Sequence, residues 1–367
     1  MTPTLVAYVS GHGFGHISRS LTVLNHLRKT APDARILVRS SVARWMVERT
    51  AAPGITLIPG PCDTGAVQRD SLHLDVADTL RQADAFMADW PAHLSRETRW
   101  LREVHASLVM ADIPPLGIAA AAAAGVPAIA MGNFTWDWIY RHWPGGATLA
   151  DRIGAIYADA TLALRLPLCA GFETLPTVVD VPFVARVSQC RPDEVRRRMG
   201  WPREDRLVLA SFGGFGQQGF DTRALSSLGP DVRVILPPDA LAAGPAAGGS
   251  LLALDEAVMS AQGLRYEDLV RAVDVVVSKP GYGIIAECVA NDTALVYTSR
   301  GDFPEFDVLV RAMPGLIRSA FISHDDLFAG VWQAAITEAL SADRPSSALR
   351  VDGARVVANV LADRLRS

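Results

Sequence analysis

The sequence has few of the features expected of a disulfide-stabilised, metal-binding or nucleic-acid-binding protein. Only four of its 367 residues are cysteines, and they are too widely spaced to form a C-x-x-C pair or a Cys/His cluster. Neither a disulfide framework nor a zinc site is indicated, and a reducing, cytoplasmic location is expected. The 35 basic and 39 acidic residues give a formal net charge of −4. This balance lacks the basic excess that would attract nucleic acid or an anionic membrane.

Long hydrophobic runs are also lacking. The longest, LGIAAAAAAGVPAIAMG at 116–132, is rich in alanine and is interrupted by Gly125 and Pro127. A membrane-spanning helix needs about 20 predominantly apolar residues. No basic segment precedes the first apolar run, so no signal peptide is expected. The stretch predicts a buried helix followed by a strand, which excludes a transmembrane segment and leaves peripheral membrane contact open.

Short apolar runs alternate with helical patterns along the whole chain. In the first half they lie at 5–10, 34–40, 55–60, 107–112, 127–132 and 160–166. The rhythm restarts at 206–212 and continues at 232–238, 274–279 and 294–299. Continuous apolar strands that alternate with helices indicate parallel sheets covered on both faces. The predicted fold class is therefore α/β, with two Rossmann-like, doubly wound domains.

The length also favours two domains, because single cores stop growing near 250–300 residues. The segment at 173–202, in which prolines are followed by a charged helical pattern, separates the two halves of the chain. We predict an N-terminal domain at 1–185 and a C-terminal domain at 186–345. A terminal helix at 346–367 is expected to be able to pack back on the first domain.

The loop GHGFGH at 11–16 follows the first predicted strand. Ligands of open α/β sheets bind at this carboxyl edge, where glycines let a ligand approach the backbone. The spacing is G-x-G-x-G rather than the dinucleotide G-x-G-x-x-G, and an imidazole at His12 or His16 would crowd a pyrophosphate. His16 instead suits proton transfer at neutral pH. We interpret the loop as catalytic with His16 as the base; the alternative is that His16 only caps the helix or lines the domain seam.

A second constellation, SKPGYGIIAE at 278–287, joins a buried strand to a helix. The start of that helix could hold a diphosphate beside Lys279, and Glu287 could accept hydrogen bonds from a ribose diol. The alternative is that Glu287 pairs with an arginine and the glycines only form a turn. The predicted nucleoside-diphosphate site comprises Ser278, Lys279, Pro280, Gly281, Gly283 and Glu287, together with Gly213, Gly214, Phe215 and Gly216 from the loop SFGGFGQQG at 211–219.

These motifs resemble those of the GT-B superfamily of nucleotide-sugar glycosyltransferases. His16 matches that family's catalytic histidine, while Gly281 and Glu287 match its diphosphate-binding helix and ribose-binding glutamate. Lys279 departs from the phosphate-binding histidine of plant members. The resemblance implies two Rossmann-like domains that face each other across a cleft, with 1–185 as the acceptor-side domain and 186–345 as the nucleotide-sugar-binding domain. It also implies an inverting, metal-independent transfer from a nucleoside-diphosphate sugar, with a UDP-linked donor favoured, to a hydroxyl or similar acceptor, with no cofactor beyond this co-substrate.

A more specific likeness is to the N-terminal, glycosyltransferase-like half of plant L-arabinokinases. It is carried by YVSGHGFGHISRS, by the segment from ADIPP to DWIY, by VDVPFVAR and by the segment from SKPGYG to EFDVL. No P-x-G-L-S-S-S type ATP loop occurs in the sequence, so sugar-kinase activity is not implied. The bacterial transferases that add N-acetylglucosamine to a lipid-linked cell-wall precursor are more distantly similar. Small-molecule and lipid-linked acceptors therefore both stay open.

The family resemblance suggests further site residues. In some GT-B enzymes an aspartate orients the histidine, and Asp112, at the end of the strand SLVMAD, stands at the comparable place. Its alternative role is that of a turn former at the strand end. The aromatic segment NFTWDWIYRHW at 133–143 could be core or an acceptor platform. The predicted acceptor contacts are His12, Phe14, Asn133, Trp136 and Asp137, and those to the donor sugar are Arg300, Asp302 and Glu305.

Other functions remain open at this point. An epimerase or hydrolase of the same fold would need acid/base groups that the sequence does not identify. An NADP-dependent reductase could use Arg39, Ser40 and Ser41 for the 2′-phosphate but would leave Glu287 unused. A catalytically idle sugar-nucleotide sensor would retain the Glu287 site and tolerate loss of His16. No D-x-D motif occurs, so we expect no metal site.

Overall fold

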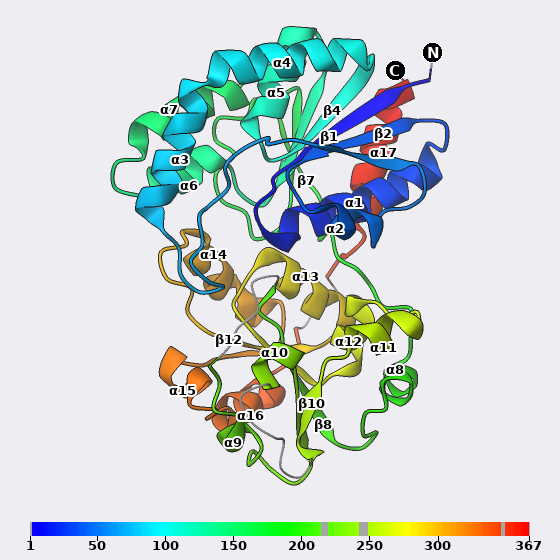
Figure 1. Ribbon diagram of the computed structural model, residues 1–367, viewed down its shortest axis with the longest axis vertical. Coiled ribbons are helices and arrows are strands. Elements are labelled where there is room, and N and C mark those ends of the chain that lie inside the picture. The colour runs from blue at the N-terminus through cyan, green and yellow to red at the C-terminus, as the bar shows by residue number, and fades with distance from the viewer. Residues whose placement is uncertain (1, 214–218, 242–248, 346–348, 367) are drawn as a thin grey trace. The chain divides into compact units, whose positions relative to one another are not determined.

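The computed structural model describes residues 2–213, 219–241, 249–345 and 349–366. The chain forms two compact units, each built on one parallel β-sheet (Figure 1). The first unit comprises 1–67, 74–185 and 350–367, and the second comprises 68–73 and 186–349. Both units are α/β, as the alternation of apolar runs predicts.

The sheet of the first unit has the strand order β3-β2-β1-β4-β5-β6-β7. Its strands are β1 (Thr4–Val9), β2 (Arg35–Ser40), β3 (Ile55–Pro59), β4 (Ala106–Asp112), β5 (Ala128–Gly132), β6 (Leu162–Arg165) and β7 (Val178–Asp180). Every residue of β1 is buried. Because neighbouring side chains of a strand point to opposite faces, burial of the whole run requires helices on both sides of the sheet.

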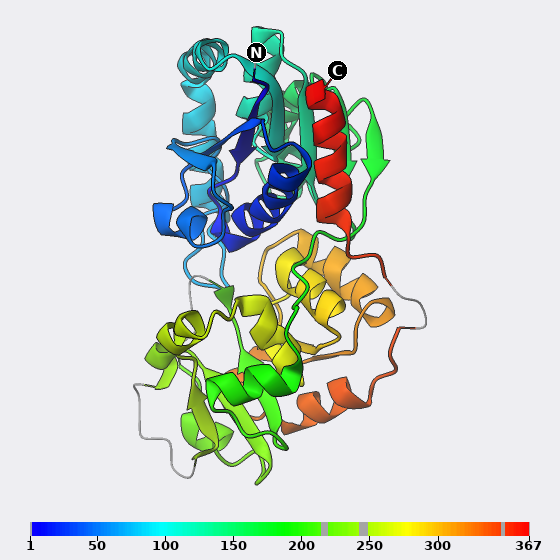
Figure 2. The same cartoon turned by 90° about the vertical axis from the view of Figure 1, so that its right-hand side faces the viewer.

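The helices of the first unit are α1 (Gly13–Thr30), α2 (Arg44–Glu48), α3 (Val76–Ala88), α4 (Trp90–Glu103), α5 (Pro115–Ala124), α6 (Trp136–Arg141), α7 (Ala147–Tyr157) and α17 (Gly353–Arg366). Alternate β1 residues, Leu5, Ala7 and Val9, share one core with α1 and α17. On the other face α5 approaches β1 so closely that a methyl group on Gly117 would lie 2.6 Å from the Tyr8 ring. Figure 2 shows α17, in red, beside α1, in dark blue.

The sheet of the second unit has the order β10-β9-β8-β11-β12-β13. Its strands are β8 (Arg206–Ala210), β9 (Val232–Leu236), β10 (Leu251–Ala253), β11 (Val275–Ser278), β12 (Ala294–Tyr297) and β13 (Ser319–Phe321). Its helices are α8 (Pro192–Met199), α9 (Thr222–Leu225), α10 (Pro238–Leu241), α11 (Glu256–Ala261), α12 (Tyr266–Ala272), α13 (Tyr282–Asn291), α14 (Glu305–Ala312), α15 (His324–Phe328) and α16 (Gln333–Ser341), with a 3₁₀ turn η3 at Met313–Gly315. The segment 68–73 joins this unit through Leu72, which is buried in its core.

All ten apolar runs of the sequence form strands, with ends that differ by at most two residues. Sequence patterning misses β7, β10 and β13, which have three residues each and lie at sheet edges. An edge strand of this length buries too little to require a continuous apolar run. The stretch at 116–132 forms the buried helix α5 and strand β5, as predicted. Within the described ranges no helix is both long and apolar enough to cross a bilayer.

The packing of α17 on α1 predicts a stability effect. Leu361 is fully buried in the core of the first unit, so Leu361→Ala should lower the free energy of unfolding by about 2–5 kcal/mol through lost burial and a residual cavity. Asn359→Ala on the exposed side of α17 is the control and should change it by less than about 0.5 kcal/mol. Chemical denaturation followed by circular dichroism measures both, and equal effects would contradict this packing.

Candidate functional site

In the first unit, the structure brings His16 and Asp112 together. The parallel neighbours β1 and β4 end side by side, and the β1–α1 loop is tied to β4 by a hydrogen bond from the Ser10 amide to the Asp112 carbonyl oxygen, 3.0 Å. His16 lies in the first turn of α1, which begins at Gly13. Its Nδ1 is 2.9 Å from Oδ1 of Asp112, and both side chains are buried.

Two other side chains of α1 also donate to the Asp112 carboxylate. Arg19 Nε donates to Oδ2 at 2.8 Å and a second guanidinium nitrogen donates to Oδ1, while Ser20 Oγ donates to Oδ2 at 2.7 Å. Sequence reasoning missed both residues. The available signal was the spacing of Arg19, which lies three residues after His16 and hence on the same side of a helix.

The contacts of Asp112 determine which nitrogen of His16 can act as a base. Nδ1 lies 2.9 Å from both Asp112 Oδ1 and Arg19 Nη2. Arginine only donates, so the Arg19 contact is a hydrogen bond only if Nδ1 carries no proton. A bond from Nδ1–H to a carboxylate is charge-assisted, and Arg19 is already satisfied by Asp112, so we assign the proton to Nδ1. Nε2 then carries the lone pair.

Asp112 is held in its ionised form. Burial by itself would raise the pKa of this carboxyl, but the charge and hydrogen bonds of Arg19, followed by those of His16, hold it well below its usual range. The carboxylate therefore stays an acceptor throughout the neutral pH range. The carboxylate accepts hydrogen bonds from both His16 and Arg19, so the site is a group of three side chains rather than the simple dyad predicted from sequence.

The predicted acceptor residues of the first unit have different surroundings. Asn133 is buried, donates to the Pro167 carbonyl oxygen at 2.6 Å and accepts from Arg19. Asp137 is also buried and accepts from Thr174 Oγ1 at 3.1 Å. Neither side chain offers an open surface to an acceptor in this structure.

The aromatic residues predicted near the acceptor also differ in burial and in packing partners. Trp136 is only 2% exposed and stacks on Tyr140, with ring centroids 5.5 Å apart, while Phe134 packs edge-on against both Trp136 and His16. Phe14, at 36% exposure, instead contacts Trp45. The His12 ring lies edge-on to Trp136, with centroids 6.3 Å apart. The structure therefore groups His12, Phe134 and Trp136 near His16, whereas Phe14 packs against Trp45.

Asp63 is a site residue that the sequence did not reveal. It is partly buried, and its two oxygens accept from Ser10 Oγ and Trp136 Nε1, each at 3.0 Å. Burial raises the pKa of Asp63, although the charge of His16 and the two hydrogen bonds oppose the shift. Asp63 comes after β3 and belongs to no recognisable sequence motif. Only the fold shows that its hydrogen bonds connect the end of β1 with α6.

In the second unit, Glu287 lies on α13 and pairs with Arg186. Arg186 Nε donates to Glu287 Oε1 at 2.6 Å, and a second guanidinium nitrogen contacts the same oxygen. Burial raises the pKa of Glu287, Arg186 opposes this shift, and Glu267 adds to it. Pairing with an arginine was the alternative to the ribose-binding interpretation. It engages only Oε1, because among the described residues Oε2 has no hydrogen-bond partner.

The start of α13 is open, as a ligand-binding helix start requires. A methyl group placed on Gly281 or Gly283 would meet no atom within 4 Å, and the same holds for Gly213, which has a φ of +76°. The first amides of a helix have no partner within the helix, so they can bind an anion. Ser278 and Pro280 are buried below this start, where Ser278 Oγ donates to the Ser211 carbonyl oxygen. The predicted contacts Gly214, Phe215 and Gly216 lie outside the described residues.

Lys279, which precedes α13 in the chain, has a lowered pKa. Burial lowers its pKa to about 7, the charge of Arg300 lowers it further, and Asp70 and Glu305 oppose the shift. Arg300 pairs with Glu305 at 3.3 Å and its guanidinium carbon lies 3.6 Å from the centroid of Phe303. Asp302 is exposed. Lys279, Arg300 and Glu305 therefore form one charged group, to which Asp70, missed from the sequence, adds a carboxylate from the segment 68–73.

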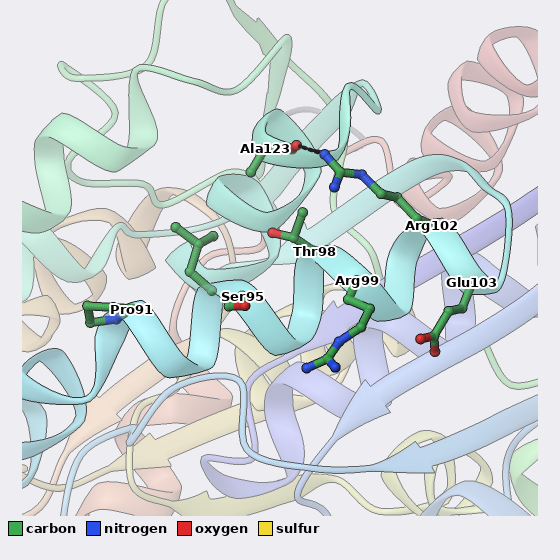
Figure 3. Close-up of a pocket in the computed structure, with 8 residues that line it drawn as sticks. Pro91, Ser95, Thr98, Arg99, Arg102, Glu103 and Ala123 are labelled. Atoms are coloured by element: carbon green, nitrogen blue, oxygen red, sulfur yellow. Dashed lines mark hydrogen bonds between the residues drawn. The ribbon is translucent and has the colours of Figure 1, made fainter.

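Two further features are not part of the predicted glycosyltransferase site. Arg39, which a reductase would use for a 2′-phosphate, is paired with the buried Glu97 at 2.7 Å. A surface hollow along α4 is lined by Pro91, Leu94, Ser95, Thr98, Arg99, Arg102, Glu103 and Ala123, where Arg102 donates to the Ala123 carbonyl oxygen (Figure 3). None of the residues predicted for the site lines this hollow.

Comparison with solved structures identifies the fold. The chain aligns over its full length with the glycosyltransferase of kitacinnamycin, covering 97% of that chain with a TM-score of 0.64 and 18% identity. It also aligns over its full length with UDP-glucose: anthocyanidin 3-O-glucosyltransferase in complex with UDP, covering 99% of that chain with a TM-score of 0.62 and 11% identity. MurG of Acinetobacter baumannii aligns with 98% of this chain and 99% of its own, with a TM-score of 0.54 and 11% identity. The chain has the GT-B fold, as predicted.

Sequence comparison confirms the second likeness. The chain is 26% identical over 360 residues to L-arabinokinase of Arabidopsis thaliana. The match covers 96% of this chain and 34% of that protein, so the chain spans about a third of the length of this curated relative. No protein-family model matches the sequence.

The low pKa of Lys279 predicts pH-dependent binding of a diphosphate. A bound anion favours protonated Lys279 and raises its pKa, so affinity is full below the free-protein pKa of about 7 and falls as pH rises above it. The dissociation constant for UDP should rise by up to about tenfold for each pH unit above 7. Calorimetric titration at pH 6, 7 and 8 measures this.

Lys279→Arg is the matched control for this titration, because a guanidinium stays charged throughout the range. Ionisation of UDP itself affects both proteins equally, so the difference between the two curves isolates Lys279. Parallel curves for the wild type and Lys279→Arg would show that Lys279 does not titrate against the ligand.

Proposed function

We propose that the protein is a glycosyltransferase that moves a sugar from a UDP-linked donor to an acceptor hydroxyl with inversion, using His16 as the base. The observation that carries the proposal is the buried contact between His16 Nδ1 and Asp112, 2.9 Å, in a chain with the GT-B fold. This contact supports an Nε2 lone pair at the carboxyl edge of the first sheet, where ligands of such sheets bind.

In the proposed reaction, His16 Nε2 removes the proton from the acceptor hydroxyl as its oxygen attacks the anomeric carbon. A general base in this position typically contributes 10²–10⁴-fold to the rate. The new bond forms on the face opposite the departing group, so the anomeric configuration inverts. Asp112 holds Nδ1–H and stabilises the imidazolium that results, while Arg19 and Ser20 fix the carboxylate.

The departing UDP takes the electrons of the broken glycosidic bond and gains negative charge. The open start of α13 supports a role in binding it, since its amides and helix dipole would stabilise the diphosphate. Lys279 adds a positive charge when protonated, and Glu287 would accept from the ribose. Because these groups supply the charge stabilisation, the proposed reaction uses no metal ion. The neighbour solved in complex with UDP supports UDP as the first ligand to test.

The acceptor is the part of the reaction that the geometry restricts least. We propose a small molecule or a lipid-linked compound with a reactive hydroxyl, bound near His12, Phe134 and Trp136. The edge-on contact of His12 with Trp136 and the hydrogen bond from Trp136 to Asp63 support this placement. A reductase is disfavoured because the Arg39–Glu97 ion pair already satisfies the arginine that a 2′-phosphate would need.

Asp112→Asn tests the catalytic arrangement. Asparagine carries no negative charge to stabilise the His16 imidazolium, and its amide group favours the wrong tautomer of His16. We therefore expect kcat to fall by about a hundredfold or more. Binding of UDP, measured by calorimetry, should change by less than twofold, because Asp112 belongs to the first unit. Asp33→Asn, the same substitution at an exposed position of the first unit, is the matched control and should leave kcat within a few-fold of wild type. Unchanged turnover in Asp112→Asn would remove Asp112 from the mechanism.

The donor site is tested by titrating the protein with UDP, GDP, dTDP and NADP. One nucleoside diphosphate should bind in the micromolar range, and Glu287→Ala should weaken that binding at least tenfold, since a hydrogen bond to a charged group is lost. Glu204→Ala, at an exposed position of the second unit, should bind as the wild type does. Binding of NADP alone, unaffected by Glu287→Ala, would refute the transferase proposal.

A further inference from the structure

Arg186 lies between two buried carboxylates of the second unit. Besides its hydrogen bond to Glu287 Oε1, its Nη1 is 3.5 Å from Oε2 of Glu267. Its guanidinium carbon lies over the ring of Tyr266, 5.6 Å from the centroid. Glu267 is on α12 and Glu287 on α13, so one cation brings together acids from two helices.

This arrangement leaves two acceptor atoms unsatisfied. Glu287 is 6% exposed and Glu267 is 5% exposed, yet neither Oε2 atom accepts a hydrogen bond from any described residue. A buried acceptor without a donor costs free energy, and more so when it is charged. Arg186 hydrogen-bonds Glu287 Oε1 and only approaches Glu267 Oε2 at 3.5 Å, so the cluster has more acceptor oxygens than hydrogen bonds to satisfy them. A ligand that brings hydrogen-bond donors would complete it.

The cluster lies where the second sheet would bind a ligand. Tyr266 hydroxyl is 2.6 Å from Ser211 Oγ, just after β8, and Ser278 at the end of β11 donates to the Ser211 carbonyl oxygen. Gly283 lies one turn before Glu287 on α13, and so on the same side of the helix, with open space above it. A ligand whose diphosphate lies at the start of α13 would therefore extend toward the two carboxylates.

We propose that Glu267 is a second nucleoside-binding carboxylate, positioned with Glu287 by Arg186. The two oxygens that lack a hydrogen bond accept from two different donors of one nucleoside, Glu287 from a ribose hydroxyl and Glu267 from the other hydroxyl or from an N–H of the base. Both kinds of donor are present in uridine, as the 2′- and 3′-hydroxyls and the N3–H. This inference rests on the proposed nucleoside-diphosphate site and adds to it a residue that no motif of the sequence indicates.

The test compares UDP binding by the wild type, Glu267→Gln and Glu287→Gln, with Glu204→Gln as the matched surface control. Glutamine keeps the size of the side chain but replaces a charged acceptor, so each buried variant should bind UDP roughly tenfold to a hundredfold more weakly. Thermal melts confirm that the variants are folded. If Glu267→Gln is not, Glu267→Asp, which keeps the charge but withdraws the carboxylate, takes its place.

Modified ligands separate a direct contact from a structural effect. The wild type and Glu267→Gln are titrated with 2′-deoxy-UDP, 3′-deoxy-UDP and N3-methyl-UDP. If Glu267 binds the nucleoside, one of these ligands loses affinity with the wild type but loses little more with Glu267→Gln, because the same contact is already gone. Losses that add fully for all three ligands would overturn the proposal, because Glu267 would then act only through the fold.

The two proposals fail in different ways. Wild-type affinity for UDP in Glu267→Gln, together with weak binding by Glu287→Gln, would overturn the role of Glu267 and leave the donor site intact. Absence of nucleoside-diphosphate binding by the wild-type protein would overturn both.

Discussion

The Asp112 carboxylate is the group on which the organisation of the first unit's site depends. It lies at the end of β4, fully buried, and accepts from His16, Arg19 and Ser20 of α1. A buried carboxylate is stable only when it is paired and hydrogen-bonded, so these three donors and this acceptor require one another. The same contacts connect the second half of the unit's sheet to its first helix and set the orientation of the imidazole. Stability and the proposed chemistry thus share one side chain.

The second unit uses a buried arginine and carboxylate in a different way. Asp112 is saturated by donors, whereas Glu287 and Glu267 share Arg186 and each retain an oxygen without a hydrogen bond. A saturated group can hold a neighbouring base in place, and an unsaturated group can receive a ligand's donors. This difference agrees with a base on one unit and a nucleoside site on the other. It also explains why the pairing of Glu287 with an arginine does not exclude ligand binding.

Several parts of the site followed from local patterns because parallel strands end at one edge of a sheet. His16 and Asp112 come after neighbouring strands, β1 and β4, so their proximity was predictable once the runs were assigned. Arg19 could have been found by its spacing from His16. Asp63 and Arg186 could not, because Asp63 belongs to no motif and Arg186 lies 101 residues before Glu287 in the chain.

The aromatic segment at 133–143 shows the limit of composition. Its residues suggested an open platform, but Trp136 is buried against Phe134 and Tyr140, and Asp137 accepts from Thr174. Adjacent residues of a helix point in different directions, so the short helix α6 separates Trp136 from Asp137. Whether Trp136 or Asp137 could face a ligand depends on the elements packed around α6 rather than on the residue types in the segment.

By itself the sequence determined the two α/β units, ten of the strands, the glycine-rich helix starts and the positions of His16, Asp112, Lys279 and Glu287. These features depend on apolar periodicity and on backbone geometry, which act over a few residues. Only the tertiary structure decided the edge strands and the partners of each buried charge. A buried charged side chain must be paired with an opposite charge, and its partner can come from a segment that is distant in the chain. Local sequence patterns therefore do not identify that partner.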